Sequence, residues 1–306
     1  MKPKLFINFG LPKTSSTNLQ KNFYPFIEGI NYLGRVQGGG LKGNSEIFNE
    51  FNLYIEGGKE YEFNDDRLSQ LKKNFTKNLK NKINLISMEN WAFPYQKNVK
   101  TNKIEIVSQF EKLKRLRKFT ENLHAECSFY VVHRKPTEGI VSLFVTAQNR
   151  IEKIFGHKYL NFKEFLLKYE NKDKDFENMK LFFDVYNINR IKEIFSESEL
   201  KIFHYNDIKN NPEKFMVNFF EYLNLKKDYS LLKNITTKTG VTPLKDKNYF
   251  VKTPNTLFIL LKKLLPEFIK EKIKFFISLT SFKSILLNDY EISKEEIEKL
   301  RYLIND

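Results

Sequence analysis

Short apolar runs alternate with amphipathic stretches along most of the chain. Buried strands are predicted at residues 4–9, 83–88, 128–133 and 200–205. Helical spacing is found at residues 16–26, 68–79, 104–123, 136–150, 161–170, 176–195, 212–223 and from 256 onward. Residues 28–64 are rich in Gly and Asn and predict long loops. Strands alternating with helices predict an α/β fold, a parallel β-sheet flanked by helices.

The chain contains no internal repeat and no low-complexity linker. We therefore predict one domain over residues 1–250 and a helical C-terminal extension over residues 251–306, packed on the same domain. Ser293 and Glu296 predict a capping box at the last helix. The apolar run at the N-terminus is too short for a signal peptide, and no segment approaches the roughly 20 apolar residues of a membrane span. We expect a cytoplasmic protein, and its single cysteine, Cys127, fits a reducing compartment.

The charge is strongly basic, because 52 Lys and Arg stand against 37 Asp and Glu, a net +15. Such an excess is typical of proteins that bind nucleic acid. However, only eight of the basic residues are Arg, the side chain best suited to bidentate phosphate recognition. We therefore predict no nucleic-acid partner. One Cys and four scattered His offer no metal-ligand spacing, so no metal site is predicted.

The segment after the first predicted strand has the chemistry of an anion site. A Gly-Leu-Pro turn at residues 10–12 leads into a lysine and four hydroxyl residues, at the point where a helix begins. These are Lys13, Thr14, Ser15, Ser16 and Thr17. Amide N–H groups at a helix start bind anions, and hydroxyls and lysine add to them. The segment is not a Walker A motif, and an ordinary hydroxyl cap at a strand–helix turn is the alternative interpretation.

Two further strand ends carry candidate residues. Arg134 follows the third strand, and Ser142 lies eight residues later in the helix that begins at Pro136, so both can meet on one phosphate. A solvated Arg at a helix start is the alternative. Glu89 follows the second strand and is a candidate general base, or else an ordinary surface carboxylate. His133 is the rival base.

These motifs resemble those of sulfotransferases that use 3′-phosphoadenosine-5′-phosphosulfate (PAPS). Residues 12–17, followed by Leu19-Gln20, resemble the family's phosphosulfate-binding loop, although Ser15 stands where that loop usually has Gly. If this position needs a positive φ, Ser strains it. Arg134 and Ser142 match the residues that hold the 3′-phosphate. Residues 87–89 (Ser-Met-Glu) match a stretch of the carbohydrate sulfotransferases, and residues 205–208 match a strand–helix stretch of the family.

The resemblance covers residues 4–26, 83–91, 128–146 and 200–225, and implies that the parallel β-sheet is P-loop-like. It also implies an in-line sulfuryl transfer from PAPS to an acceptor, leaving adenosine 3′,5′-bisphosphate (PAP). It implies that the loop residues hold the 5′-phosphate and that Lys13 neutralises charge on the leaving phosphate. Glu89 would activate the acceptor, a carbohydrate or glycolipid. Arg134 and Ser142 would select PAPS over ATP. No metal is required by this set.

Other interpretations of the chain remain open at this point. The basic, amphipathic residues 257–277 can lie on an anionic membrane surface or can pack as ordinary helices with solvated lysines. A P-loop nucleotide kinase using ATP and Mg²⁺ is one alternative function, although a Walker A motif is lacking. A non-catalytic protein that binds membranes or polyanions is the other.

Overall fold

Five parallel strands form the central sheet of the protein. The computed structural model describes residues 2–34, 45–57, 63–80, 83–97, 104–146, 161–236, 244–245, 248–254 and 287–304. Across the sheet the order is β2 (Ile30–Tyr32), β3 (Ile83–Ser87), β1 (Lys4–Asn8), β6 (Glu126–His133) and β7 (Leu200–His204). Every neighbouring pair is parallel. The predicted α/β fold with a P-loop-like parallel sheet is therefore confirmed.

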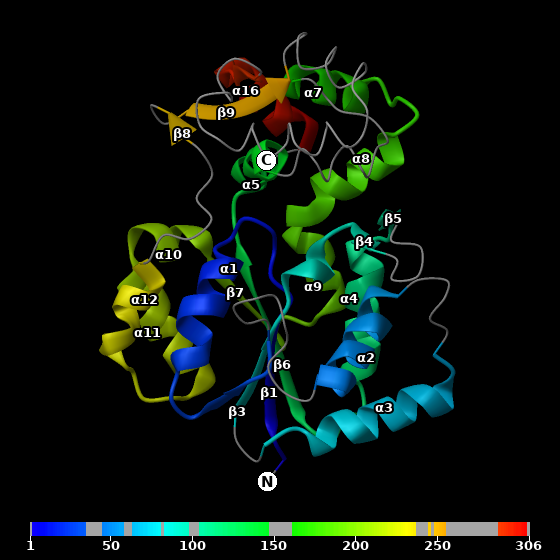
Figure 1. Cartoon of the computed structure of the whole chain (residues 1–306), viewed down its shortest axis with the longest axis vertical. Coiled ribbons are helices and arrows are strands. Elements are labelled where there is room, and N and C mark those ends of the chain that lie inside the picture. Colours follow the sequence, from blue (N-terminus) through cyan, green and yellow to red (C-terminus); the bar gives the residue numbers. More distant parts are fainter. Residues whose placement is uncertain are drawn as a thin grey trace, which may run out of the picture. The chain divides into compact units, whose positions relative to one another are not determined.

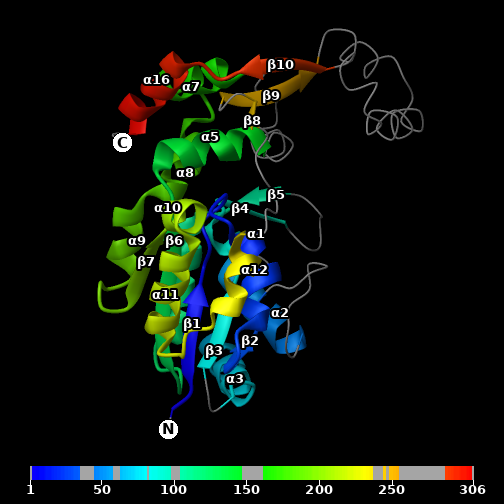
Figure 2. The same ribbon diagram turned by 90° about the vertical axis from the view of Figure 1, so that its left-hand side faces the viewer.

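Helices cover both faces of this sheet, which explains why its strands are continuous apolar runs (Figure 1). On one side lie α1 (Ser16–Asn18), α10 (Tyr205–Asn210), α11 (Pro212–Leu223) and α12 (Leu232–Thr236). On the other lie α2 (Ser45–Glu56), α3 (Asp65–Lys77), α4 (Gln109–Thr120) and α9 (Ile188–Ile194). The central strands β1 and β3 and the edge strand β2 run side by side (Figure 2). The strands β1, β3 and β6, after which candidate residues were predicted, are parallel neighbours, so their carboxyl ends lie at the same edge of the sheet.

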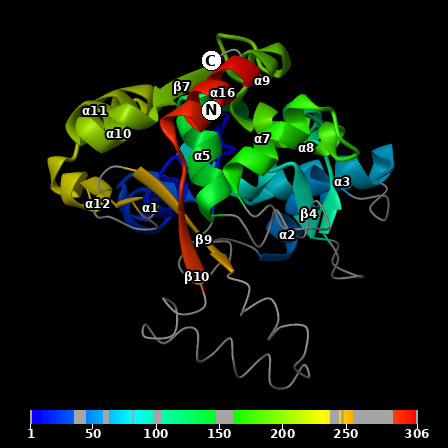
Figure 3. The same ribbon diagram turned by 90° about the horizontal axis from the view of Figure 1, so that it is seen from above.

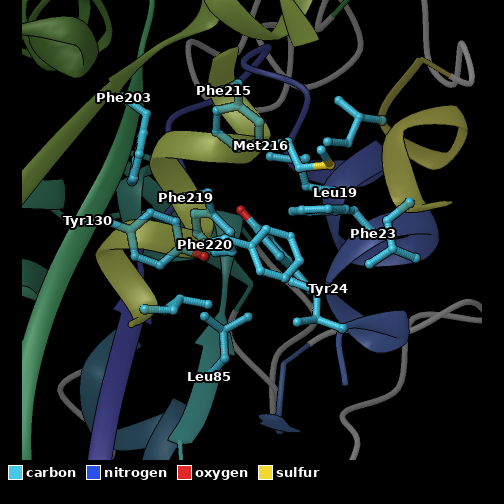
Figure 4. Close-up of a cluster of buried hydrophobic side chains, with 14 of the residues drawn as sticks. Leu19, Phe23, Tyr24, Leu85, Tyr130, Phe203, Phe215, Met216, Phe219 and Phe220 are labelled. Atoms are coloured by element: carbon cyan, nitrogen blue, oxygen red, sulfur yellow. The ribbon is translucent and has the colours of Figure 1, made fainter. Parts of the chain in front are cut away.

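An aromatic cluster fixes the helical stretch that follows β1. This stretch runs from α1 into a π-helical turn, η1 (Leu19–Phe23), and a 3₁₀ turn, η2 (Tyr24–Phe26). Phe23 and Tyr24 are fully buried and pack with Tyr130 and Phe219, as Figure 4 shows. The Tyr24 and Phe219 ring centroids lie 5.5 Å apart. Because this packing holds the helix against the sheet, it also holds the preceding loop in place.

The chain divides into two compact units. The first is Met1–Ile140 with Glu177–Val241 and contains the parallel sheet; the second is Val141–Phe176 with Thr242–Asp306. In the second unit, α7 (Phe162–Glu170), β8 (Leu244–Lys245), β9 (Asn248–Pro254), β10 (Leu287–Glu291) and α16 (Lys294–Ile304) are described. The three strands described in this unit are antiparallel, with β9 between β10 and β8. Figure 3 shows β9 beside β10. The predicted domain boundary at residue 250 falls within β9.

The last helix begins as predicted. The Ser293 amide N–H donates to Glu296 Oε2 at 2.7 Å, and the Glu296 amide donates to Ser293 Oγ at 3.2 Å. This reciprocal pair is the predicted capping box, and it satisfies two amides at the start of α16. The preceding residues differ from the prediction, because 287–291 form strand β10 rather than helix.

Other elements also correct the sequence-based prediction. The predicted loops at 28–64 contain β2 and the helix α2, whose Phe48, Phe51 and Ile55 are buried at helical spacing. The helix predicted from residue 104 begins at Gln109, because Ser108 caps it by accepting from the Phe110 amide at 3.2 Å. Residues 104–106 instead form strand β5, paired with β4 (Tyr95–Lys97).

Two remaining elements matter for the site. Helix α5 (Pro136–Thr146) follows β6, and α8 (Phe176–Phe183) leads into the 3₁₀ turn η4 (Asp184–Tyr186). Among the described residues, no helix has both the length and the apolarity that a bilayer crossing needs. The basic segment 257–277, predicted to be amphipathic, lies outside the described residues.

Candidate active site

The loop after β1 has an alternating backbone. Lys13 and Ser15 have φ of 59° and 65°, in the left-handed region, whereas Pro12 is restricted to a negative φ by its ring. Thr14, between them, does not share the positive φ. Alternation of right- and left-handed residues turns successive amide N–H groups toward a common side and forms an anion-binding concavity. The positive φ of Lys13 and Ser15, on either side of Thr14, is the left-handed part of such an alternation.

Three consecutive carbonyl groups of this loop accept hydrogen bonds from the protein. The Leu11 oxygen accepts from Thr14 Oγ1 at 2.6 Å and from Ser16 Oγ at 3.1 Å. The Pro12 oxygen accepts from the Tyr186 hydroxyl at 2.7 Å, and the Lys13 oxygen accepts from Arg134 Nη1 at 3.1 Å. Because the acceptors are engaged in this way, the amide-bearing side of the loop is the side suited to an anion.

The hydroxyl residues of the loop divide into two pairs. Thr14 and Ser16 are buried, and their hydroxyls brace the loop through the Leu11 carbonyl group. Ser15 is half-buried and Thr17 is exposed. Ser15 precedes α1 as its N-cap residue, but its side chain makes no capping hydrogen bond. The first-turn amides of the helix therefore lack the side-chain partner that an N-cap residue usually supplies.

Replacing Ser15 with glycine is expected to stabilise the protein by about 1 kcal/mol, because a non-glycine residue pays roughly that in the left-handed region. The gain would appear as a higher midpoint in urea unfolding at unchanged slope. Thr17→Gly is the matched control: it also adds a glycine, but within the helix, where glycine destabilises. A Ser15→Gly protein less stable than wild type would contradict the assignment of strain to this residue.

Glu89 lies against the same loop. It begins the 3₁₀ turn η3 (Glu89–Ala92) directly after β3, and it is half-buried. A Cβ placed on Gly10, whose φ is +37°, would be 3.3 Å from both the Glu89 Cα and Ser16 Oγ. This close approach brings the end of β3 onto the start of the loop. The structure thus places Glu89 beside the anion loop, as expected for parallel strand ends.

Buried polar side chains support this junction. Asn8 Oδ1 accepts from the Gly10 amide at 2.8 Å, and Asn8 Nδ2 donates to Ser87 Oγ at 3.2 Å. Gln20 Nε2 donates to the same Ser87 hydroxyl at 3.1 Å. Asn8, Gln20 and Ser87 were not among the predicted site residues. Their signal in the sequence is a polar residue, Asn8 or Ser87, at the end of an otherwise apolar strand.

Arg134 joins the end of β6 to the loop. Its side chain is 9% exposed, and its Nε lies 3.4 Å from Glu138 Oε2 in addition to the bond to the Lys13 carbonyl group. Its guanidinium carbon also lies 4.6 Å from the centre of the Tyr205 ring. Arg134 is therefore an ordered, largely buried cation rather than the solvated one that the alternative interpretation assumes.

A cavity of about 350 Å³ opens beside Arg134, at the carboxyl ends of β6 and β7. It is lined by His133, Arg134, Lys135, His204, Asn206, Asp207 and Lys214. Lys214 pairs with Asp207 at 3.1 Å, and His133 Nε2 lies 3.3 Å from the Tyr186 carbonyl oxygen. Basic residues outnumber the single carboxylate in the lining, so the cavity favours an anion.

Tyr186 was not predicted as part of the site. Its ring packs against helix α5 at Gly139, where an added Cβ would come within 2.4 Å of the ring. The absence of a side chain at Gly139 thus lets the Tyr186 hydroxyl reach the Pro12 carbonyl group. Ser142, the residue of α5 that the sequence predicts as part of the site, is fully buried and belongs to the second compact unit. Its part in phosphate binding stays a prediction.

Metal ligation and thiol chemistry are not apparent in the part of the chain that the structure describes. No three His, Cys, Asp or Glu residues gather there in a way that could hold a metal ion. Burial raises the pKa of Cys127 to about 12, which keeps this thiol protonated and unreactive near neutral pH.

No family model matches the chain, and no curated protein matches its sequence. Solved structures with a similar arrangement include a sulfotransferase from Alicyclobacillus acidocaldarius, at 11% identity and a TM-score of 0.43 over 100% of this chain and 96% of that one. The sulfotransferase domain from the curacin biosynthetic pathway has 14% identity and a TM-score of 0.36, and the match covers 80% of this chain and 81% of that one. The sulfotransferase domain from the Synechococcus PCC 7002 olefin synthase has 11% identity and a TM-score of 0.39, and the match covers 80% of this chain and 80% of that one. TM-scores this low leave the assignment of function to the geometry of the site.

Proposed function

We propose that the protein is a sulfotransferase that moves a sulfuryl group from PAPS to a hydroxyl of an acceptor, a carbohydrate or glycolipid. The observation that carries the proposal is the hydrogen bond from Arg134 to the Lys13 carbonyl group. It brings the Arg134 guanidinium group, at the end of β6, against the backbone of the loop after β1, which also carries Lys13. PAPS carries anionic groups at both the 5′ and the 3′ position of its ribose, so it requires two cationic groups.

In this proposal the loop binds the 5′ end of the donor. Amide N–H groups of residues 15–17 hold the 5′-phosphate, and the Lys13 ammonium group stabilises the charge that develops on the leaving phosphate oxygen. The acceptor oxygen attacks sulfur as the bond from sulfur to the bridging oxygen breaks. Glu89 takes the proton of the acceptor hydroxyl, so the products are the sulfated acceptor and PAP.

Arg134 and the cavity beside it take the 3′-phosphate in this proposal. The basic lining of the cavity supplies the positive field, with Lys135 and His204 near the guanidinium group. Ser142 adds a hydroxyl to the same phosphate, as the resemblance in sequence implies. Because ATP has no 3′-phosphate, this part of the site would select PAPS. We also propose that the enzyme acts in the cytoplasm, where residues 257–277 contact the inner membrane face that carries a lipid-linked glycan.

Titration calorimetry with PAP tests the donor. We expect binding to the wild-type protein, and we expect Arg134→Ala to weaken it by about 10- to 150-fold, the usual value of a hydrogen bond to a charged group. Arg67→Ala is the matched control, since Arg67 pairs with Glu50 on the surface, away from the loop. Absence of PAP binding, an unchanged Kd in Arg134→Ala, or tighter binding of ATP with Mg²⁺ than of PAP would overturn the proposal.

A further inference from the structure

A fully buried lysine lies behind the turn that carries Glu89. Lys112 projects from α4, is 0% exposed, and donates from Nζ to the carbonyl oxygens of Phe93 at 2.9 Å and Tyr95 at 2.8 Å. A third carbonyl oxygen, that of Asn90, lies at 3.5 Å. All three acceptors belong to the chain directly after Glu89. Among the described residues, no carboxylate forms an ion pair with Lys112.

Burying an ammonium group without a carboxylate partner is costly. A hydrophobic side chain of the same shape is often as stable or more stable at such a position, so stability does not explain Lys112. What an ammonium group adds is direction, because its three N–H donors can orient three acceptors at once. Here these acceptors are the carbonyl groups that define where η3 ends and β4 begins.

The turn is held at its other points as well. At its start, the Met88 amide donates to the Asn8 carbonyl oxygen at 2.9 Å, which ties it to β1. In its middle, the buried Trp91 donates from Nε1 to Asn52 Oδ1 of α2 at 2.8 Å. Lys112 holds the far end of the turn, so the segment that contains Glu89 is hydrogen-bonded at its start, its middle and its end.

We propose that Lys112 is a positioning residue, which fixes the backbone of residues 90–95 and thereby sets the place of Glu89 against the loop at residues 10–17. This inference rests on the proposed function, in which Glu89 is the base. Lys112 itself touches no substrate and acts through the turn. A displacement of about 1 Å in a catalytic group can cost 10²-fold in rate, so a fixed turn matters for kcat.

The titration of Lys112 gives this role a pH signature. The pKa of Lys112 is lowered from 10.5 to about 8, chiefly by burial; Glu56 of α2 opposes this shift, and Arg115 on the same helix as Lys112 adds to it. Above this pKa the amine loses one of its three donors. The turn itself contributes one further titratable group, Glu89 at its start, and the uncharged carbonyl groups of residues 90–95. Positioning is therefore complete below pH 8 and weakens above it.

The folding free energy responds to this group in the opposite direction. Since the pKa is lower in the folded state than in the unfolded state, the unfolded chain binds the proton more tightly between about pH 8 and 10.5. In that window the contribution of Lys112 to stability rises with pH. A decline in kcat above pH 8 without a parallel loss of stability from this group is thus the expected signature, and general alkaline unfolding would not produce it.

The test compares Lys112→Met with Lys114→Met, a lysine on the same helix whose side chain is 62% exposed and pairs only with Glu111. PAP release from PAPS is measured with the best acceptor of a panel of neutral and amino sugars, and PAP affinity by calorimetry. We expect Lys112→Met to lower kcat about 10- to 100-fold with the Kd of PAP within about twofold, and to lose the decline above pH 8. The Lys114→Met protein should match wild type in kcat and in the Kd of PAP.

Hydrogen exchange supplies a second measurement in case Lys112→Met folds poorly. In the wild-type protein, amides of residues 90–97 should lose protection as pH passes 8, after correction for the intrinsic rate, while residues 16–23 keep theirs. Unchanged protection, or an unchanged kcat in a folded Lys112→Met protein, would overturn the positioning role. Failure of wild type to bind PAP would instead overturn the proposed function, so the two failures are distinguishable.

Discussion

Replacing Glu89 with glutamine is expected to lower kcat by about 10²- to 10⁴-fold, the usual contribution of a positioned general base. Glutamine keeps the size of the side chain and removes its capacity to accept the acceptor proton. Because the backbone of Glu89 lies against Gly10 and glutamine leaves that backbone unchanged, the loop should keep its form. The Kd of PAP should therefore stay within about twofold of wild type. PAP release from PAPS, measured at saturating sugar acceptor, gives kcat.

The matched control is Glu111→Gln, which removes a surface carboxylate from α4 that pairs with Lys114. This change should leave both kcat and PAP affinity unaltered. Turnover of Glu89→Gln at the wild-type rate would remove Glu89 as the base and would direct attention to His133, which lines the cavity beside Arg134.

Replacing Lys13 with methionine is expected to lower kcat by about 10²- to 10³-fold, because in the proposed mechanism the residue supplies positive charge where the leaving phosphate gains negative charge. Methionine keeps the length of the aliphatic chain and loses the ammonium group. The loss in affinity for PAPS should be smaller than the loss in kcat, since the charge that Lys13 meets grows only as the bond from sulfur to the bridging oxygen breaks. Single-turnover release of PAP from bound PAPS separates this chemical step from binding.

Lys21→Met is the control for this second change, because Lys21 lies just beyond α1 on the same helical stretch and is exposed. It should change neither kcat nor PAP affinity. A Lys13→Met protein whose Kd for PAPS rose while its kcat stayed at the wild-type value would show that Lys13 contributes to binding alone, contrary to the proposed role.

Much of the fold could be predicted because burial on both faces of a parallel sheet leaves unbroken apolar runs. Four of the five sheet strands were located in this way. The fifth, β2, has only three residues, too few for a pattern to emerge from a Gly- and Asn-rich context. Helix α2 carries a clear spacing in Phe48, Phe51 and Ile55, but the polar residues around it obscure the signal. Strand β10 pairs with β9 from more than thirty residues away, and such long-range pairing overrides local spacing.

The candidate site, too, could be predicted only in part from the sequence. Lys13, Glu89 and Arg134 could be found from sequence because the carboxyl ends of neighbouring parallel strands meet, and polar residues at those ends stand out. Tyr186 and Lys112 could not, although each is bound to the site at hydrogen-bond distance. Both donate to backbone carbonyl groups, which every residue possesses, so their partners leave no trace in the amino-acid sequence.

The loop after β1 also bears on how the protein is made. Residues 12 and 13 emerge early from the ribosome, yet their carbonyl groups depend on Tyr186 and Arg134, and Asn18 Nδ2 donates to the Ile235 carbonyl oxygen at 2.8 Å. Nascent chains shorter than about 235 residues therefore lack a donor or acceptor that the finished loop uses. Contacts this distant in sequence form slowly. Capacity to bind the proposed nucleotide should appear only after residue 235 has left the ribosome, rather than with the segment that carries the motif.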